Sequence, residues 1–213
     1  MLNYLVIIFV SYLIGSFPTA IITGKLLKGI DIRQHGSGNA GGTNVFRILG
    51  KGPGIFVMAF DILKGAVATY FVSQIAFTEV GISHVYLQII AGLSAIIGHI
   101  WTIFAGFKGG KGVGTAAGML IVLFPVAILI CFVIFLLIVF TTKYVSLGSI
   151  LAAVSLPVIL FISQEIYNKP VEPVLMGLAA FIALLIVFTH RSNIQRLASG
   201  TENRMGSKKS EKS

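Results

Sequence analysis

The fold is decided by an apolar stretch at residues 113–142, which reads VGTAAGMLIVLFPVAILICFVIFLLIVFTT. A transmembrane helix needs about 20 apolar residues, so this stretch is too long for one comfortable span and too short for two full spans. Pro125 interrupts it, and because proline lacks a backbone N–H it breaks or kinks a helix. We therefore expect a break near Phe124 and two short or tilted helices that neighbouring protein must cover.

The composition of the whole chain is that of a membrane protein. Of its 213 residues, 56% are hydrophobic and only 11% are charged, and the mean hydropathy is +0.95. A soluble domain carries roughly a quarter charged residues, so an ordinary aqueous surface is excluded. The formal net charge of +9 must lie in loops and tails, where Lys and Arg mark the cytoplasmic side and contact anionic lipids or phosphorylated substrates. No nucleic-acid partner is expected.

Apolar stretches on both sides of residues 113–142 complete the predicted fold. The class is an all-α integral membrane protein with seven transmembrane helices, some of them short or broken, and its five other spans are 2–22, 53–77, 85–104, 145–163 and 174–189. With seven spans, the positive-inside rule places the N-terminus outside and the C-terminus in the cytoplasm, whereas six would put the basic tail outside. We expect a single polytopic domain at residues 1–206 and a basic, disordered tail at residues 207–213.

The first predicted span contains Pro18 shortly after Gly15 and Ser16, which predicts a kinked helix that packs closely against a neighbour. The chain enters this span without a basic region or a clear cleavage site, so we expect the helix to be retained. Cys131, the single cysteine, lies in an apolar stretch, which excludes a disulfide framework and a thiolate metal site.

Three polar side chains interrupt the predicted spans. Asp61 and Lys64 are three positions apart, so they lie on one helix face and can form an ion pair. Charged groups within a membrane are costly and frequently functional, but an ion pair that fixes helix packing is an equally good interpretation. His99, near the cytoplasmic end of the third span, is open to the same two interpretations.

Three polar segments stand out against this apolar background. The first glycine segment, residues 36–44, contains four glycines and is followed by Arg47, and the second glycine segment, residues 107–112, contains two lysines. The third polar segment is residues 190–196. Glycines leave backbone N–H groups uncovered and helix N-termini attract anions, so these segments suit a phosphate group. The predicted topology places all three at the cytoplasmic face.

Several other chemistries lack the residues that they need. The second glycine segment does not have the Gly-x-x-x-x-Gly-Lys-Ser/Thr spacing of a nucleotide P-loop, and on its own it is better interpreted as a turn that anchors a helix. The sequence has no cluster of aspartates for a divalent metal, no histidine with an aspartate five positions later and no Gly-x-Ser-x-Gly motif. We therefore expect no cofactor and no metal, and a covalent acyl-enzyme has no obvious nucleophile.

Six motifs, read together, are far more specific than any one of them: GSFP at 15–18, GSGN at 36–39, TNV with Arg47 at 43–47, GH at 98–99, FKGGKG at 107–112, and HRSNIQRL at 190–197 with Gly200 and Glu202. In this order they resemble the bacterial acyl-phosphate-dependent glycerol-3-phosphate acyltransferases. The resemblance implies a seven-helix enzyme of the bacterial cytoplasmic (inner) membrane, with its active site facing the cytoplasm. It implies transfer of a fatty acyl group from acyl phosphate to glycerol-3-phosphate, giving lysophosphatidic acid and phosphate, the first acylation of phospholipid synthesis.

The resemblance also implies roles for particular residues. Catalytic roles fall on Ser37, Lys111, His190 and Asn193. Binding of the substrate phosphates falls on Arg47, Lys108, Lys111, Arg191, Gly38, Asn39, Thr43, Asn44, Gly109 and Gly110. Supporting roles fall on Asp61, Lys64 and His99. The chain departs from the family pattern at Gly42 and Gly114, where alanine is expected, and at Trp101 and Thr102, where an aromatic-proline pair is expected; these positions concern loop geometry and the fit of the acyl chain rather than the reaction.

The chemistry of the implied reaction fits these residues. An acyl phosphate carries a good leaving group, so attack by a glycerol hydroxyl needs positioning and charge stabilisation more than a covalent nucleophile. Either His190 or the phosphate of the acyl phosphate accepts the hydroxyl proton. The expected partners are glycerol-3-phosphate, a fatty acyl phosphate and membrane lipids, and the protein is expected to be a monomer. The alternative function is a transporter of phosphate or organophosphate anions, which uses similar broken helices but places its site near the membrane midplane.

Overall fold

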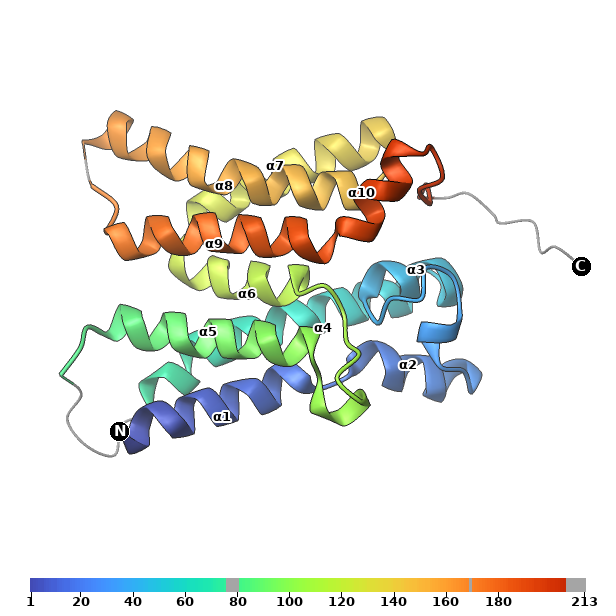
Figure 1. Cartoon of the computed structure of the whole chain (residues 1–213), viewed down its shortest axis with the longest axis horizontal. Helices are drawn as coiled ribbons and strands as arrows, with labels where there is room; N and C mark the ends of the chain where they lie inside the picture. Colours follow the sequence, from blue (N-terminus) through green and yellow to red (C-terminus); the bar gives the residue numbers. More distant parts are fainter. Residues whose placement is uncertain (76–80, 169, 206–213) are drawn as a thin grey trace, which may run out of the picture. The chain divides into compact units, whose positions relative to one another are not determined.

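The computed structural model describes residues 1–75, 81–168 and 170–205, and these residues form helices joined by loops (Figure 1). The all-α class is therefore confirmed. The structure divides into two compact units, Met1–Ile128 and Leu129–Ser213. That residues 1–206 make up one domain stays a prediction, and the tail predicted at 207–213 lies outside the described residues.

The first unit begins with a broken helix. Helix α1 (Leu2–Ser16) ends immediately before Phe17, and helix α2 (Thr19–Lys28) begins immediately after Pro18. Because Pro18 has no N–H with which to continue α1, the chain leaves the helical path at this point. The predicted kink is therefore an interruption of the helix at Phe17 and Pro18, and α1 and α2 together form one stretch long and apolar enough to span a membrane, Leu2–Lys28.

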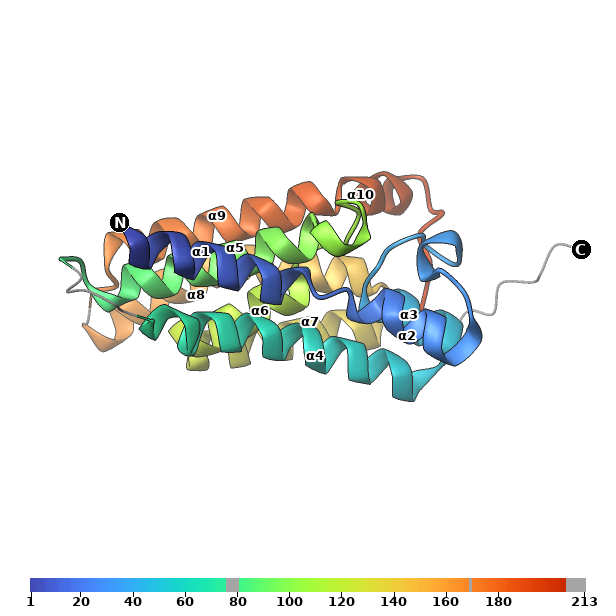
Figure 2. The same ribbon diagram turned by 90° about the horizontal axis from the view of Figure 1, so that it is seen from below.

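The other helices of the first unit place both glycine segments toward one end. In chain order they are η1 (Ile32–Gln34), α3 (Gly42–Leu49), α4 (Lys51–Tyr70), η2 (Val72–Gln74), α5 (His84–Ile100), η3 (Ile103–Ala105) and α6 (Val113–Leu123). Helices α2 and α3 lie at the end of the unit where α4 begins and α5 ends (Figures 1 and 2). The loops before α3 and after α5 therefore lie toward the same end.

Glycines bring the helices of the first unit into close contact. A side chain at Gly15 would collide with the backbone of Ala95, so α1 lies directly against α5. A side chain at Gly65 would collide with the backbone of Thr115, so α4 lies directly against α6. Small residues at helix interfaces permit this approach in membranes. The close packing predicted for the first span is confirmed.

The apolar stretch at 113–142 is broken where the sequence predicts it. Helix α6 ends at Leu123, and helix α7 (Pro125–Thr142) begins at Pro125. With 11 residues, α6 is shorter than a full span requires. Among the described residues, five helical stretches are long and apolar enough to cross a membrane, or six if α9 and α10 are taken as one bent span. The seven spans and the orientation of the termini stay predictions.

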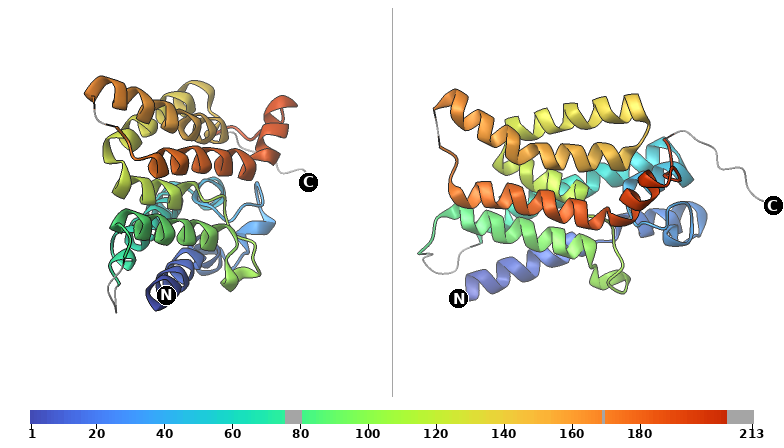
Figure 3. Two further views of the ribbon diagram at one scale, coloured as in Figure 1. Left: turned by 60° about the vertical axis from the view of Figure 1, so that its left-hand side comes forward. Right: turned by 45° about the horizontal axis from the view of Figure 1, so that its top comes forward.

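The second unit consists of most of α7 with α8 (Val145–Tyr167), α9 (Pro173–Thr189) and α10 (Arg191–Ala198). Helices α8 and α9 form an antiparallel pair (Figure 3). Helix α10 leaves the direction of α9 at an angle of 60°. His190 is the residue between these two helices, so the third polar segment begins at the bend and continues as α10.

The remaining predicted spans correspond to observed helices. The span at 53–77 corresponds to α4 followed by η2, and its last two residues lie outside the described residues. The span at 85–104 corresponds to α5 followed by η3. The span predicted at 145–163 extends further, to Tyr167, as α8.

Candidate functional site

A small hydrophobic core holds the base of the first glycine segment. Its buried members come from α2, η1, α3, α4 and the segment itself: Ala20, Ile21, Ile32, Ala40, Val45 and Val57. Ile32 precedes the segment and Val45 follows it, and both are fully buried. Burial therefore fixes both ends of the segment. Between them, Ser37 and Gly38 are exposed, as a binding loop requires.

Asn44 closes the turn of the first glycine segment. Its side-chain oxygen accepts a hydrogen bond from the backbone N–H of Ser37 at 2.9 Å. Its NH₂ group donates to the carbonyls of Ile32 at 3.0 Å and His35 at 2.9 Å. Asn44 is only 2% exposed. Its observed contacts organise the segment, and its predicted contact with a substrate phosphate stays a prediction.

The other predicted ligands of this segment lie before and along α3. Thr43 and Arg47 are on the helix, which begins at Gly42 and has no side-chain cap on its first turn. The N–H groups and dipole of a helix N-terminus favour a bound anion. Asn39, Thr43 and Arg47 are half-buried. The amide of Asn39 and the hydroxyl of Thr43 thus lie at the N-terminus of α3, and the guanidinium of Arg47 is in its last turn.

The second glycine segment lies against the end of α5. The N–H of Gly109 donates to the carbonyl of Ile100 at 3.0 Å, and the N–H of Gly110 donates to the carbonyl of His99 at 3.1 Å. A Cβ atom at Gly110 would collide with Nε2 of His99, so a side chain at this position would force the buried His99 ring or the segment to move. Because both N–H groups bond to carbonyls, the predicted role of these two glycines in phosphate binding stays a prediction.

The packing of the second glycine segment against α5 also sets the positions of its two lysines. Lys108 is exposed and Lys111 is half-buried. Gly112 adopts a left-handed conformation with φ of 83°, and α6 begins at the next residue, Val113. The helix start predicted at Val113 is therefore confirmed. Its first turn has no side-chain cap, and the cationic segment leads directly into it.

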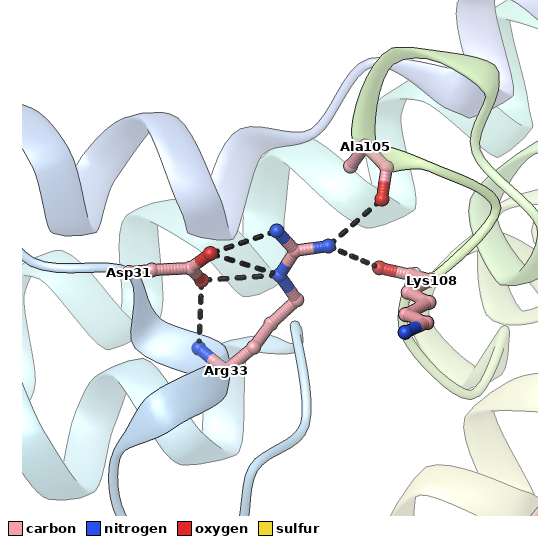
Figure 4. Close-up of polar contacts among 4 residues, drawn as sticks. All are labelled: Asp31, Arg33, Ala105 and Lys108. Carbon is pink, nitrogen blue, oxygen red and sulfur yellow. Dashed lines mark hydrogen bonds and ion pairs between the residues drawn. The ribbon is translucent and has the colours of Figure 1, made fainter.

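An arginine three residues before the first glycine segment contacts the second (Figure 4). The guanidinium of Arg33 contacts both carboxylate oxygens of Asp31, with 2.7 Å between Nη2 and Oδ2. Nη1 of the same guanidinium donates to the carbonyl of Ala105 at 2.8 Å and, more weakly, to that of Lys108 at 3.4 Å. Arg33, Asp31 and these two carbonyls are called the Arg33 clamp below. The clamp connects η1 with η3 and with the second glycine segment.

Sequence reasoning assigned no role in the site to Asp31 or Arg33. The available signal was their acid-x-base spacing, directly before the first glycine segment. That signal indicates a local ion pair, which the structure contains. It does not indicate backbone acceptors 72 and 75 positions later in the chain.

The arginine also lowers the pKa of Asp31. The hydrogen bond from the Arg33 side chain lowers this pKa from 3.8 to about 2. A carboxylate whose pKa falls on folding stabilises the folded state above its unfolded pKa, and this contribution is lost as the pH falls through the folded pKa. We expect the gap in thermal stability between wild type and Asp31→Asn to be constant above about pH 5 and to shrink between about pH 4 and pH 2. Thermal unfolding in detergent measures the gap, and an unchanged gap near the acid end would contradict the assignment.

The three polar side chains predicted within spans lie together. Nζ of Lys64 is 2.8 Å from Oδ1 of Asp61, and Nδ1 of His99 is 3.5 Å from the same oxygen. The three residues are between 4% and 6% exposed. Lys64 also donates to the carbonyl of Phe17 at 3.3 Å, in the break between α1 and α2. The predicted ion pair is confirmed, and it connects α4 with α5 and with this break.

A small polar pocket adjoins these buried charges. The residues that line it come from both glycine segments and from the helices around them, and include Ser16, Ala40, Asp61, Lys64, His99, Thr102, Gly109 and Gly110. Within the described part of the chain, the hydroxyl of Ser16 is buried and has no hydrogen-bond partner. The pocket places Asp61, Lys64 and His99 beside both glycine segments. Their predicted supporting role stays a prediction.

The third polar segment belongs to the second unit. His190 is the N-cap of α10, and its Nδ1 donates to the carbonyl of Ile186 at 2.8 Å. A neutral imidazole that carries its hydrogen on Nδ1 has its lone pair on Nε2. Arg191 is exposed, and its guanidinium lies 4.7 Å from the centre of the Phe188 ring. The predicted association of this segment with the glycine segments stays a prediction.

A glutamate positions Asn193. The side-chain amide of Asn193 donates to Oε1 of Glu202 at 2.7 Å. Ser146 donates to the same oxygen at 3.0 Å, and Arg196 donates to Oε2 at 2.7 Å. Burial raises the pKa of Glu202, but the hydrogen bonds from Asn193, Arg196 and Ser146 outweigh it and leave that pKa below its ordinary value. Glu202 therefore holds α8, α10 and the chain after α10 together. The sequence places it in a motif without indicating this role.

Comparisons with known proteins agree with one another. A family model described as glycerol-3-phosphate acyltransferase matches residues 5–200. The chain is 50% identical over 231 residues to a glycerol-3-phosphate acyltransferase of Chlorobium phaeobacteroides and 48% identical over 226 residues to one of Chlorobaculum tepidum, and each alignment covers 96% of this chain and 97% of the relative.

Two crystal structures of PlsY (YgiH), an integral membrane glycerol 3-phosphate acyltransferase, are also similar. The glycerol 3-phosphate form gives a TM-score of 0.81 at 37% identity, and covers 95% of this chain and 96% of that one. The lysophosphatidic acid form gives a TM-score of 0.78 at 36% identity, and covers 95% of each.

Proposed function

Since the chain belongs to the glycerol-3-phosphate acyltransferase family, we propose that it takes its acyl group from a fatty acyl phosphate and releases phosphate as the second product. The chain is a membrane acyltransferase, and glycerol-3-phosphate is its acyl acceptor. The similar PlsY structures, one in a glycerol 3-phosphate form and one in a lysophosphatidic acid form, support lysophosphatidic acid as the other product. Family membership leaves the alternative of an anion transporter without support.

One observation carries the proposal: two glycine-rich segments, one followed by Arg47 and one containing two lysines, both line one pocket in the first unit. The Arg33 clamp connects η1, just before the first segment, with the second. The proposed reaction brings together two substrates that each carry a phosphate, and these anions repel one another. Cations held at fixed positions reduce this repulsion and stabilise the charge that develops on the leaving phosphate. We assign Arg47, Lys108 and Lys111 to this role, with Arg191 from the third polar segment.

The proposed step needs no covalent enzyme intermediate. The hydroxyl oxygen of glycerol-3-phosphate attacks the carbonyl carbon of the acyl phosphate, and a new C–O ester bond forms. The bond between this carbon and the phosphate oxygen breaks, and phosphate leaves with the electron pair. The proton of the hydroxyl passes to His190 or to the leaving phosphate. Ser37 and Asn193 orient the reacting groups, and such positioning contributes a large part of the rate in reactions of this kind.

The contacts of His190 support its role as the base. Its Nδ1–H donates to the carbonyl of Ile186, which fixes the ring and places the lone pair on Nε2. A neutral histidine is the usual general base near neutral pH. The choice between His190 and the leaving phosphate is tested by the variant described in the Discussion.

The membrane position of the enzyme follows from its two substrates. Glycerol-3-phosphate is soluble in water, whereas each buried CH₂ of the acyl chain contributes about 0.8 kcal/mol to membrane association. We propose that the active site faces the cytoplasm from the bacterial inner membrane, with seven membrane segments in which α6 is the short one. The exposed Lys25, Lys28 and Lys51 around the first glycine segment support this orientation. We expect the enzyme to act as a monomer.

The donor is tested with purified protein in lipid or mild detergent. Palmitoyl phosphate and palmitoyl-CoA are supplied in separate samples with glycerol-3-phosphate, and lysophosphatidic acid and phosphate are both measured. Phosphate release that needs both substrates and matches lysophosphatidic acid in amount is the expected result. Turnover with the thioester alone would overturn the donor while leaving the acyltransferase in place.

Gly110 gives a test of the geometry of the second glycine segment. Gly110→Ala is expected to lower the rate of acyl transfer by up to about 10²-fold, because its methyl group would collide with His99 and displace the segment. The rate with palmitoyl phosphate is compared with that of Gly52→Ala, where an added Cβ meets nothing within 4 Å. Equal rates for the two variants would show that this close approach has no importance for catalysis.

A further inference from the structure

The loop that leads into the second glycine segment has few apolar contacts to hold it. It includes η3, which has no buried residue. Ile103, Phe104 and Phe107 are 48%, 59% and 58% exposed, so their side chains add little to the packing of the loop. Ala105 is the exception, because it packs against the core of the first glycine segment. Polar contacts must therefore provide much of what holds this loop in place.

The Arg33 clamp supplies such contacts from a rigid base. Ile32, next to Arg33, is fully buried in the core of the first glycine segment. The backbone N–H of Arg33 donates to Oδ1 of Asp31 at 3.0 Å, so the ion pair and the backbone of η1 are held together. From this base the guanidinium reaches the carbonyls of Ala105 and Lys108. The clamp thus acts between a fixed element and a lightly packed one.

The clamp holds backbone rather than the functional side chain. Figure 4 shows the side chain of Lys108 pointing away from the guanidinium of Arg33, while its carbonyl accepts the hydrogen bond. The Lys108 carbonyl is three residues from Lys111 along the chain. A guanidinium that fixes this backbone therefore limits where both lysines can place their ammonium groups.

We propose that Arg33 is a positioning residue for acyl transfer, which holds the second glycine segment near the first so that Arg47 and the two lysines of the second segment act on the same pair of phosphates. This inference rests on the function proposed above. Arg33 itself contacts no substrate in this scheme. It acts through Ala105 and Lys108, and its loss lets the two segments separate.

The geometry of the clamp requires arginine. One edge of the planar guanidinium, with Nε and Nη2, faces Asp31, and Nη1 faces the carbonyls. A lysine is a single point of charge on a flexible stem, and it cannot hold a carboxylate and a carbonyl in two fixed directions at once. Arg33→Lys keeps the charge and loses the geometry, so it separates positioning from simple electrostatic attraction.

Three variants test the proposal: Arg33→Met, Arg33→Lys and, as a matched control, Lys51→Met, which removes an exposed cation near the same segment. We expect Arg33→Met to remain folded and to lose on the order of 10²-fold in kcat/KM with palmitoyl phosphate and glycerol-3-phosphate. Arg33→Lys should recover only a small part of this loss, and Lys51→Met should stay within about twofold of wild type. Full activity of either Arg33 variant would overturn the proposal.

A second comparison separates positioning from general destabilisation. In the proposal, Asp31→Asn lowers kcat/KM in the same direction by a smaller factor, and adding it to Arg33→Met lowers kcat/KM no further, because both act through one clamp. Melting temperatures are measured for each variant. A loss of kcat/KM that follows the fraction of folded protein, or effects that multiply in the double variant, would contradict a shared positioning role.

Hydrogen exchange keeps this inference distinct from the proposed donor. Loss of the clamp should raise amide exchange at Gly109 and Gly110 in Arg33→Met, while amides of the α1–α5 contact stay as in wild type. If the donor were a thioester, this exchange pattern would remain and only the acyl-phosphate assay would fail. If the exchange at these amides were unchanged, the positioning role would fail whatever the donor.

Discussion

Lys64→Met is expected to lower the free energy of unfolding by about 3–5 kcal/mol, because it leaves the carboxylate of Asp61 buried without its main counter-charge. The two groups are 2.8 Å apart, and their side chains are 3% and 7% exposed. His99 offers Asp61 only a longer contact of 3.5 Å. The variant also removes the donor to the carbonyl of Phe17. A buried charge that loses its partner costs far more than the pair contributes in net terms.

The double variant Asp61→Asn, Lys64→Met is the matched control. It removes both charges and leaves groups of similar size, so most of the lost stability should return. Unfolding in detergent, followed by circular dichroism at increasing denaturant, measures the three proteins on one scale. A Lys64→Met protein as stable as wild type would show that the pair is not needed for packing. The functional interpretation of the pair would then be favoured.

His190→Ala is expected to lower kcat by about 10²–10⁴-fold if the histidine takes the hydroxyl proton, which is the usual contribution of a general base. Nδ1 of His190 donates to the Ile186 carbonyl, so the ring enters the reaction already oriented. Alanine removes both the base and this hydrogen bond. The KM for glycerol-3-phosphate should change much less than kcat, because the loss falls on the chemical step.

The measurement compares kcat of folded His190→Ala and His84→Ala with wild type. His84 is the first residue of α5, whereas the second glycine segment lies against the last residues of that helix. Removal of the His84 side chain should leave kcat unchanged within about twofold. A His190→Ala enzyme with near wild-type kcat would assign the proton to the leaving phosphate. The rest of the proposed mechanism would stand in that case.

Local rules of helix formation predicted a large part of the fold. Proline lacks the N–H that continues a helix, so the breaks at Pro18 and before Pro125 follow from two residues, whereas Pro157 lies inside α8 without ending it. The spacing of Asp61 and Lys64 likewise sets their contact, because residues three apart on a helix meet. These features depend on neighbours within about one helical turn, and the sequence shows those neighbours directly.

Contacts between segments that are distant in the sequence could not be predicted in the same way. Nothing near Arg33 indicates that it reaches the carbonyl of Ala105, because backbone acceptors carry no signature in the sequence. Glycine composition suggested amide groups directed at phosphate, yet the N–H groups of Gly109 and Gly110 bond to the end of α5. Which amides are used within the protein depends on tertiary packing, and only the three-dimensional arrangement decides it.

The break in the first helix has a consequence for how the protein is made. The carbonyl of Ser16 receives its hydrogen bond from the hydroxyl of Thr102, and the carbonyl of Phe17 receives one from Lys64 in addition to one from the backbone N–H of Thr19. Polar backbone groups without partners are costly in lipid. During synthesis, the first segment reaches the membrane long before these donors leave the ribosome. Its assembly is therefore complete only after the chain has been translated past Thr102, and until then the insertion machinery or water must shelter the break.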